Sequence, residues 1–386
     1  PTYYDFFKDG TRENKKWLEE IISKDWKKKF DLREVPFRVS LCKTDEYKYE
    51  MIVSSHHILY DGWSSGIILN EFLEAYDALA RHEKPVPPVK GKFKEYVKWV
   101  QLRDREKSKQ YWKEYLENFE SQSRFPGKTK KEGEKEFDCT GNYHLKISPD
   151  TTEKLESFLK SQKITLSALF YSGWGILLQK YNYREDILFD TTVSERSVKI
   201  KGIEKTVGLL METVPFRIKT AAGQTIKEVL SKVHAGLRER EDLEVGPPPN
   251  IKEYLPGGYR VGFDSVLVME NYPLSGLMGK AGNHELELAS FSINEMTRYD
   301  VTVIITAFKG IEIGITYDRT VFDEQGIKNL CRYLVTILEE MVESPGKTIS
   351  EINILSGEER QTLLYEFNCR GAESQRYKRP VYILDR

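Results

Sequence analysis

The chain reads SHHILYDGWS from Ser55 to Ser64. Apolar and polar residues alternate just before this stretch, which predicts a strand over Glu50–His57 with one buried face. Neighbouring side chains on a strand point to opposite faces, so only one of the two adjacent histidines can face a given cavity. The Asp61-Gly62 turn then returns a carboxylate and a backbone without a Cβ to the end of the strand.

This arrangement of residues suits proton transfer. Histidine titrates near neutral pH, so one of the pair can accept a proton from an amine or a hydroxyl group. Asp61 can orient a histidine or pair with a cation, and Gly62 lets a substrate or another chain approach the backbone. The competing interpretation is a structural histidine pair beside an ordinary Asp-Gly turn. With six histidines in the chain, HxxxDG is expected by chance about 0.03 times, which favours a functional motif.

Helical and strand-like periods alternate along the rest of the chain. A helix is expected over Ile67–Glu83, with Ser64 or Ser65 as its N-cap, and the proline-rich segment 84–91 ends it. One long aromatic helix is expected over Phe93–Phe119. The further elements are expected in this order: strand Tyr143–Ile147, helix Leu166–Tyr181, strands Ile187–Val193 and Thr213–Lys219, helix Ile226–Glu241, strands Ser265–Glu270, Val301–Ala307 and Ile311–Tyr317, and helix Phe322–Glu343.

This alternation predicts an α/β (α+β) fold in two lobes. The charged stretch SQSRFPGKTKKEGEKE, residues 121–136, contains Gly and Pro and few apolar residues, so we expect it to be the linker between the lobes. The expected organisation is an N-terminal lobe over 1–120, a C-terminal lobe over 137–355, and a C-terminal linker over 356–386 toward a downstream domain.

Composition disfavours several other classes of protein. The 386 residues carry 59 Lys and Arg against 60 Asp and Glu, a balance that disfavours a nucleic-acid binder. No run approaches the roughly 18 apolar residues of a membrane span, and the first residues lack the apolar core of a signal peptide. The four cysteines are far apart and form no CxxC pair, which indicates neither a disulfide framework nor a structural zinc site. We therefore expect a cytoplasmic protein without nucleic-acid or membrane partners.

HHILYDGWS resembles the HHxxxDGWS signature of condensation domains of nonribosomal peptide synthetases, which share HxxxDG with chloramphenicol acetyltransferase. Further blocks follow in the family's order over roughly residues 28–365. They are FDLREVPFRVSL from Phe30, FKEYVKWVQ from Phe93, DILFDTTVSERS from Asp186, VGLLMETVPFRI from Val207 and FDSVLVMENYP from Phe263. The family's two opening blocks, S-P-x-Q and R-H-E-x-L-R-T, are not present, so the resemblance implies an N-terminal lobe that is incomplete at its start.

The resemblance implies two chloramphenicol-acetyltransferase-like lobes that form a V, with an active-site tunnel between them. It implies amide formation between an upstream acyl or peptidyl thioester and the amine of a downstream aminoacyl thioester, in the biosynthesis of antibiotics or other secondary metabolites. Peptidyl carrier proteins would present both substrates on phosphopantetheine arms, and an adenylation domain would lie beside the chain. The domain itself would bind no cofactor and no metal.

The resemblance also implies roles for the motif histidines and the glycine. His57 matches the family's second motif histidine, which acts either as a general base on the amine or by positioning that amine. His56 is expected to point away from the tunnel and to help hold the motif. Gly62 is expected to line the site.

The remaining signature residues are expected to support this site. Asp61 is expected to be structural and to pair with Arg196, the matching arginine of the family's TxVSGR-type block. Trp63 and Ser64 complete the signature.

Three carboxylates stand where the family's blocks usually carry other residues. Glu212 replaces an asparagine, and Glu195 and Asp190 replace glycines. Surface carboxylates are commonly solvated, so the simpler expectation is that these side chains turn toward solvent. The alternative is that one of them tunes the charge of the substrate site or pairs with a cation, and the sequence leaves both open. The Tyr and Trp residues over 96–119 lie at helical spacing and are expected to be core.

Other members of the superfamily are alternatives. Epimerization domains share HHxxxDG but typically read DGVSWRIL from the motif aspartate onward. This chain reads DGWSSGIIL from Asp61. An esterifying or soluble acetyltransferase-like enzyme is a further option. Non-catalytic domains that recruit carrier proteins or a partner enzyme tend to lose the second histidine or the aspartate, whereas His57 and Asp61 are both present here.

Overall fold

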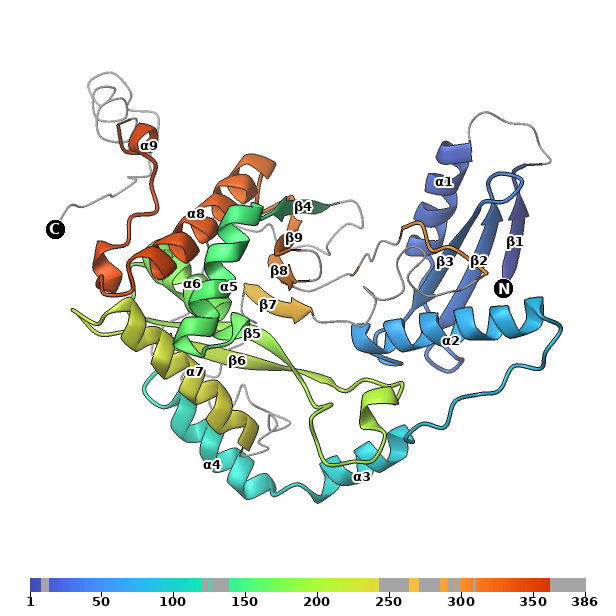
Figure 1. The fold of residues 1–386 in the computed structure, drawn as a ribbon, viewed down its shortest axis with the longest axis horizontal. Helices are drawn as coiled ribbons and strands as arrows, with labels where there is room; N and C mark the ends of the chain where they lie inside the picture. The colour runs from blue at the N-terminus through green and yellow to red at the C-terminus, as the bar shows by residue number, and fades with distance from the viewer. Residues whose placement is uncertain are drawn as a thin grey trace.

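The computed structural model describes residues 1–7, 14–119, 125, 139–242, 264–270, 285–290, 295, 299–307 and 310–361. Two β-sheets form the centres of two lobes (Figure 1). Most of the expected linker over 121–136, and of the expected C-terminal linker over 356–386, lies outside the described residues.

The N-terminal lobe is built on a three-stranded sheet in the order β1-β2-β3. β1 (Thr2–Asp5) runs parallel to β2 (Phe37–Lys43), and β2 runs antiparallel to β3 (Tyr49–Ser55). Helix α1 (Asn14–Lys27) lies beside this sheet, and α2 (Gly62–Ala80) runs beneath the strands in the view of Figure 1.

β3 is shorter than the expected strand over Glu50–His57, because the chain turns at the two histidines. The N–H of His56 still donates to the Pro36 carbonyl at 3.0 Å, and the N–H of Leu59 then closes a turn onto the His56 carbonyl at 3.0 Å. Both histidines therefore follow the sheet and are not part of it.

Helix α2 begins at Gly62, earlier than the expected Ile67. Its N-cap is Asp61, whose carboxylate accepts a hydrogen bond from the N–H of Ser64 at 2.9 Å. Ser64 lies inside the helix, so the expectation that Ser64 or Ser65 caps it is wrong. An aspartate satisfies a free N–H at the start of a helix as well as a serine does.

The expected single helix over Phe93–Phe119 is also wrong, because the chain forms two helices, α3 (Phe93–Leu102) and α4 (Arg105–Leu116). Arg103 leaves the helical conformation with φ of −56° and ψ of 145°. The carboxylate of Asp104 then accepts from the N–H of Lys107 at 3.0 Å and starts the second helix. The two helices lead along one side of the molecule from the N-terminal to the C-terminal lobe (Figure 1).

The C-terminal lobe contains a six-stranded sheet in the order β4-β9-β8-β7-β5-β6. β7 pairs with β5 and β8 in parallel, and the other neighbours are antiparallel. The strands are β4 (Thr140–Lys146), β5 (Asp186–Ser194), β6 (Met211–Lys219), β7 (Ser265–Glu270), β8 (Val301–Thr306) and β9 (Glu312–Asp318). The helices are α5 (Pro149–Gln162), α6 (Leu166–Asn182), α7 (Ile226–Asp242), α8 (Glu324–Glu343) and α9 (Gly357–Gln361).

Helix α6 forms the centre of the C-terminal core. Its sequence LFYSGWGILL has apolar residues on every side, a pattern typical of a helix that is buried all round. All residues from Ala168 to Gln179 are buried, because the helix packs against α7, α8 and strands of the sheet. This core supports the β5–β6 hairpin, which extends toward the N-terminal lobe (Figure 1).

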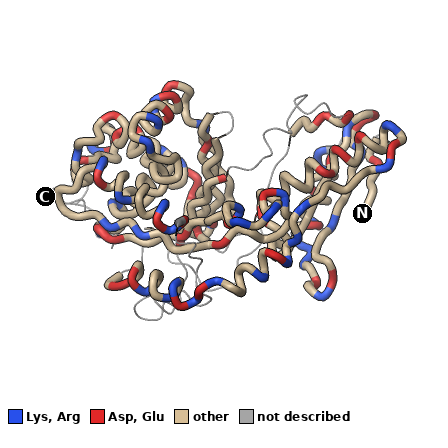
Figure 2. Tube along the Cα trace, turned by 60° about the horizontal axis from the view of Figure 1, so that its bottom comes forward, with Lys and Arg blue, Asp and Glu red and all other residues tan. Residues whose placement is uncertain are grey.

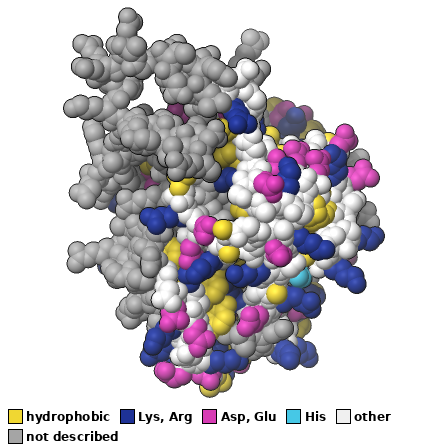
Figure 3. All heavy atoms as spheres, turned by 90° about the vertical axis from the view of Figure 1, so that its left-hand side faces the viewer, with side chains coloured by type: hydrophobic (Ala, Val, Ile, Leu, Met, Phe, Trp, Pro, Cys, Tyr) yellow, Lys and Arg dark blue, Asp and Glu magenta, His cyan; other side chains and the backbone are white. Residues whose placement is uncertain are grey.

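The surface carries charges of both signs. Basic and acidic residues are interspersed along both lobes (Figure 2), and on the face drawn in Figure 3 hydrophobic side chains lie scattered among charged ones. Within the described residues, no helix has the length and the apolar character needed to cross a membrane. The same residues contain no group of three or more His, Cys, Asp or Glu side chains arranged to hold a metal ion.

Candidate functional site

The two motif histidines occupy the turn after β3, and they differ in what they contact. The Nδ1 atom of His56 accepts a hydrogen bond from the N–H of Ile58 at 3.1 Å, so this ring holds the turn. The side chain of His57 is exposed and makes no hydrogen bond or ion pair with another residue that the structure describes. Its imidazole can therefore meet a substrate, as a general base must.

Asp61 is buried, with 1% of its surface exposed, and it anchors the motif to the other lobe. Its carboxylate accepts from the N–H of Leu210 at 2.9 Å, in addition to capping α2 through Ser64. Its own N–H donates to the Gly208 carbonyl at 3.2 Å. Both of these contacts are with residues 195–210, which join β5 to β6 and which we call the β5–β6 connection.

The ion pair between Asp61 and Arg196 that the sequence predicts is present. Arg196 Nη2 lies 2.9 Å from Asp61 Oδ1, and it donates to the Ser64 hydroxyl at 2.9 Å as well. Arg196 Nη1 donates to the carbonyls of Ile203 and Thr206 at 3.2 and 2.9 Å. Burial lowers the pKa of Arg196, and the Asp61 carboxylate opposes that shift. A buried guanidinium with this many acceptors holds its partners in a fixed geometry.

The next two signature residues make the same contact between the lobes. The Ser64 hydroxyl donates to the Gly208 carbonyl at 3.0 Å and accepts from the Gly208 N–H at 3.1 Å. The indole N–H of Trp63 donates to the Glu204 carbonyl at 3.2 Å, and the Arg196 guanidinium lies 5.6 Å from the centre of the Trp63 ring. Gly62 is buried as the first residue of α2. The whole DGWS segment is therefore fixed against the β5–β6 connection.

The β5–β6 connection is enclosed by α3 on its other side. A Cβ on Gly208 would lie 2.2 Å from the Phe93 ring, so only a glycine permits this close approach. The connection thus lies between the start of α2 and the start of α3, and it meets the turn that carries His57.

Glu195 is not solvated, which corrects the simpler expectation from the sequence. It is 8% exposed, and its carboxylate accepts hydrogen bonds from the Tyr96 hydroxyl and from Arg103 Nη2. Arg103 Nη1 lies 3.8 Å from Glu212 Oε2, and its guanidinium lies 4.1 Å from the centre of the Trp99 ring. The alternative that one carboxylate pairs with a cation therefore holds for Glu195.

The Glu195 carboxylate changes the ionisation of two neighbours, Glu212 and Tyr96. Burial and the nearby Glu195 carboxylate raise the pKa of Glu212 to about 7, while Arg103 acts in the opposite direction. Burial and the Glu195 carboxylate also raise the pKa of Tyr96. The third carboxylate, Asp190, accepts a hydrogen bond from the Tyr299 hydroxyl at 2.6 Å and is not simply solvated either.

Arg103 is the residue of this region that the sequence pattern did not indicate. It follows α3 directly, at a point where the apolar period predicts an uninterrupted helix. The available signal was the Asp104 N-cap, which marks the end of one helix and the start of another.

Comparisons with known proteins agree on one family. A family model described as "Condensation domain" matches residues 3–364. Surfactin synthase subunit 3 of Bacillus subtilis (strain 168) is 32% identical over 355 residues, which cover 91% of this chain and 27% of that protein. Bacitracin synthase 3 of Bacillus licheniformis is 30% identical over 394 residues, which cover 98% of this chain and 6% of that protein. The chain thus spans about a quarter or less of these relatives.

Solved structures share the two-lobed fold. The X-domain from teicoplanin biosynthesis matches with a TM-score of 0.73 at 22% identity, over 92% of this chain and 81% of that one. The first condensation domain of the CDA synthetase matches with a TM-score of 0.68 at 16% identity, over 92% of this chain and 77% of that one. The expected fold, two chloramphenicol-acetyltransferase-like lobes, is confirmed. The chain belongs to the condensation domain family of nonribosomal peptide synthetases.

Proposed function

We propose that this chain joins an upstream acyl or peptidyl thioester to the amine of a downstream aminoacyl thioester. The observation that carries the proposal is the exposed His57 imidazole, held in a turn that Asp61 and Arg196 fix between the lobes. The neighbouring His56 has its Nδ1 atom engaged by the backbone N–H of Ile58. His57 is instead open to a ligand within the described part of the chain.

The proposed reaction is a single acyl transfer. The amine nitrogen attacks the thioester carbonyl, a C–N bond forms as the C–S bond breaks, and the proton of the amine ends on the departing thiol. His57 accepts that proton or orients the amine, and both roles require its ring at the reacting atoms. Asp61, Arg196, Trp63 and Ser64 keep the turn in place, and Gly62 lines the site.

The proposal includes the surroundings of the domain. The lobes extend over 1–120 and 137–355, enclose a tunnel, and are joined by a linker over 121–136, with 356–386 leading to a further domain. Upstream and downstream peptidyl carrier proteins bring the substrates on phosphopantetheine arms, and the domain needs no metal or cofactor of its own. The free cysteines Cys42, Cys139 and Cys331 support a cytoplasmic setting for this synthesis.

Intact-mass analysis of carrier proteins tests this reaction class. The chain within its native polypeptide is mixed with a donor carrier and an acceptor carrier, each loaded with an aminoacyl-phosphopantetheine. We expect the acceptor carrier to gain the mass of the donor acyl group. Carrier binding without transfer would contradict the proposal in favour of a recruitment domain, and deuterium wash-in at the donor α-carbon would favour epimerization.

A further inference from the structure

A second charged cluster lies beside the signature residues, and no part of the HHxxxDG motif contributes to it. We call it the Arg103 cluster, after its only described cation. Arg103 donates to Glu195, faces Glu212 at 3.8 Å and packs on Trp99, while the Tyr96 hydroxyl also donates to Glu195. The cluster joins α3 to the end of β5 and to the start of β6.

The Arg103 cluster is connected to the site through the backbone. Glu195 directly precedes Arg196, the partner of Asp61, at the start of the β5–β6 connection. The N–H of Glu195 donates to the Leu210 carbonyl at 2.8 Å, and the N–H of Leu210 donates to Asp61 Oδ2 at 2.9 Å. The two ends of the β5–β6 connection are therefore held together at Glu195 and Leu210. One end contacts Asp61 through Arg196 and the other through Leu210.

The composition of the cluster argues against a purely stabilising role. Two carboxylates share one guanidinium, and Arg103 Nε and Glu212 Oε2 are buried without a hydrogen-bond partner among the described residues. Buried ion pairs contribute little net stability because desolvation offsets their attraction, but their geometry is specific. The planar guanidinium fixes the position of the carboxylate to which it donates more closely than a lysine could.

We propose that Arg103 is a positioning residue for the amide-forming site. By holding the Glu195 carboxylate, it sets the start of the β5–β6 connection, and so it sets Arg196 and the Asp61 carboxylate that fixes the His57 turn. This inference rests on the proposed function for its effect on turnover, but the link from Arg103 to Asp61 can be measured separately.

Arg217 offers a matched control on the same hairpin. Its guanidinium pairs with Asp186 at 2.6 Å and donates to the carbonyls of Tyr115 and Glu117, both at 2.9 Å. Its side chain is 10% exposed, against 14% for Arg103. Both arginines thus tie the β5–β6 hairpin to the segment that contains α3 and α4, but Arg217 does so at the end of the hairpin away from Asp61.

The first experiment measures amide hydrogen exchange in the whole protein, wild type against Arg103→Met and Arg217→Met. The reporters are the N–H groups of Ser64 and Leu210, which donate to the Asp61 carboxylate. We expect faster exchange at both in Arg103→Met and unchanged exchange in Arg217→Met. Unchanged exchange in Arg103→Met, or equal acceleration in both variants, would overturn the inference whether or not the wild type forms an amide.

The second experiment measures turnover with loaded carrier proteins. We expect Arg103→Met to lower kcat by about tenfold to 100-fold with little change in KM for the acceptor carrier, since a displacement of about 1 Å can cost about 100-fold. Arg217→Met should lower the melting temperature similarly but keep kcat within about twofold of wild type. If the wild-type protein transfers no acyl group, the proposed function is refuted. The amide hydrogen exchange of the first experiment then decides whether Arg103 positions Asp61.

A double variant separates positioning from stability. Arg103→Met leaves the buried Glu195 carboxylate without its cation, which destabilises the fold. Adding Glu195→Gln removes that charge, so the melting temperature should recover while kcat stays low. Recovery of kcat together with the melting temperature would overturn the inference, because the cluster would then act through stability alone.

Discussion

At the scale of single residues, Asp61 connects the histidine turn to the second lobe. Its carboxylate accepts from two backbone N–H groups and from Arg196, and it is almost wholly buried. A neutral amide could keep one of the backbone contacts at most, because its NH₂ group would face the N–H of either Ser64 or Leu210, and a donor of Arg196 in both orientations.

Asp61→Asn is therefore expected to lower the free energy of unfolding by about 3–5 kcal/mol, since it leaves the Arg196 charge buried without a counter-ion. Urea denaturation measures the change. Asp31→Asn is the control, because Asp31 and Arg33 form an exposed pair and should leave the midpoint unchanged. An Asp61→Asn midpoint equal to that of wild type would show that Arg196 does not depend on this carboxylate.

Glu212 gives the molecule a specific dependence of stability on pH. Its pKa is raised to about 7 in the folded chain, mainly by burial, against about 4.3 for a glutamate in an unfolded chain. Between these values the folded state holds a proton that the unfolded state has lost, so this group's contribution to stability falls as the pH rises through the window. Glu212→Gln stays neutral, and its melting temperature should exceed that of wild type by a margin that grows from pH 5 to pH 8. A constant difference across this range would contradict the shifted pKa.

The sequence predicted the residues of the site better than their surroundings. His57, Asp61 and Arg196 followed from the family resemblance, and the Asp61–Arg196 pair is present. The burial of Glu195 could not be predicted, because its partner Arg103 lies 92 positions away, at the break between α3 and α4. Local patterns carry no information about such a distant contact.

At the scale of elements, α6 depends on glycine for its contact with the sheet. A Cβ on Gly175 would lie 2.3 Å from Ile218 Cγ1 of β6, well inside the roughly 3.5–4.0 Å at which carbon atoms pack. Gly236 on α7 has nothing within 4 Å of the same position.

The two glycines therefore predict opposite effects of the same substitution. Gly175→Ala should destabilise the protein by about 1–3 kcal/mol through overpacking, although alanine favours a helix. Gly236→Ala should stabilise it by about 0.5–1 kcal/mol, since only the helix preference changes. Urea denaturation of both variants measures this difference. A Gly175→Ala variant as stable as Gly236→Ala would show that α6 can move away from β6.

The sequence predicted elements best where apolar residues are regular. The expected strand over Ser265–Glu270 coincides with β7, and the expected helix over Leu166–Tyr181 ends one residue before α6 does. Helix α5 was not predicted, although Ser148 and Pro149 form a regular helix start. The break at Arg103 was not predicted because the apolar stripe continues through it.

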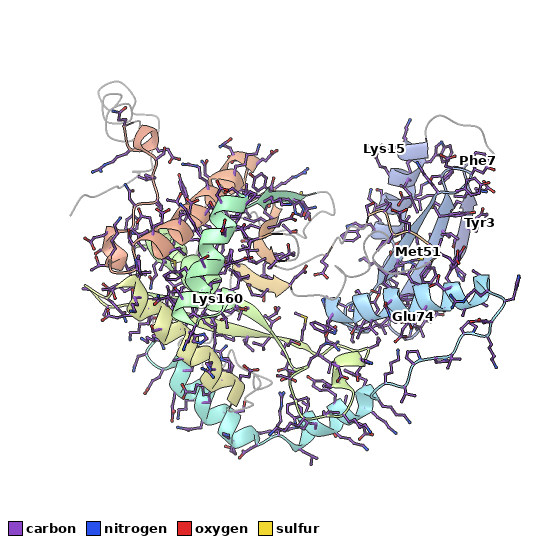
Figure 4. The ribbon with its side chains drawn as sticks, viewed as in Figure 1. Tyr3, Phe7, Lys15, Met51, Glu74 and Lys160 are labelled. Carbon is purple, nitrogen blue, oxygen red and sulfur yellow. The ribbon has the colours of Figure 1, made fainter. Side chains whose placement is uncertain are left out.

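At the scale of the whole molecule, the two lobes differ in how much apolar surface they bury. Nearly all large hydrophobic side chains that are exposed within the described residues lie in the first 102 residues, whereas the C-terminal lobe holds one large continuous core. Tyr3 and Met51, which lie on the N-terminal sheet in Figure 4, are 55% and 38% exposed.

This difference predicts unequal protection from amide hydrogen exchange. Elements with few buried apolar contacts open more readily, so the amides of β2 and β3 should exchange faster than those of β8 and β9. Mass spectrometry of the protein after timed deuterium labelling measures both sets together. Equal protection of the two sheets would mean that the lobes unfold as one unit.

The most direct test of the site compares the rates of amide formation in wild type, His57→Ala and His56→Ala, with loaded carrier proteins. The two histidines are neighbours in one turn, so His56→Ala controls for damage to that turn. We predict that His57→Ala lowers the rate by about 100-fold or more, while His56→Ala stays within about tenfold of wild type. A His57→Ala variant that keeps the wild-type rate, or that loses no more than His56→Ala, would contradict a role for His57 at the reacting atoms.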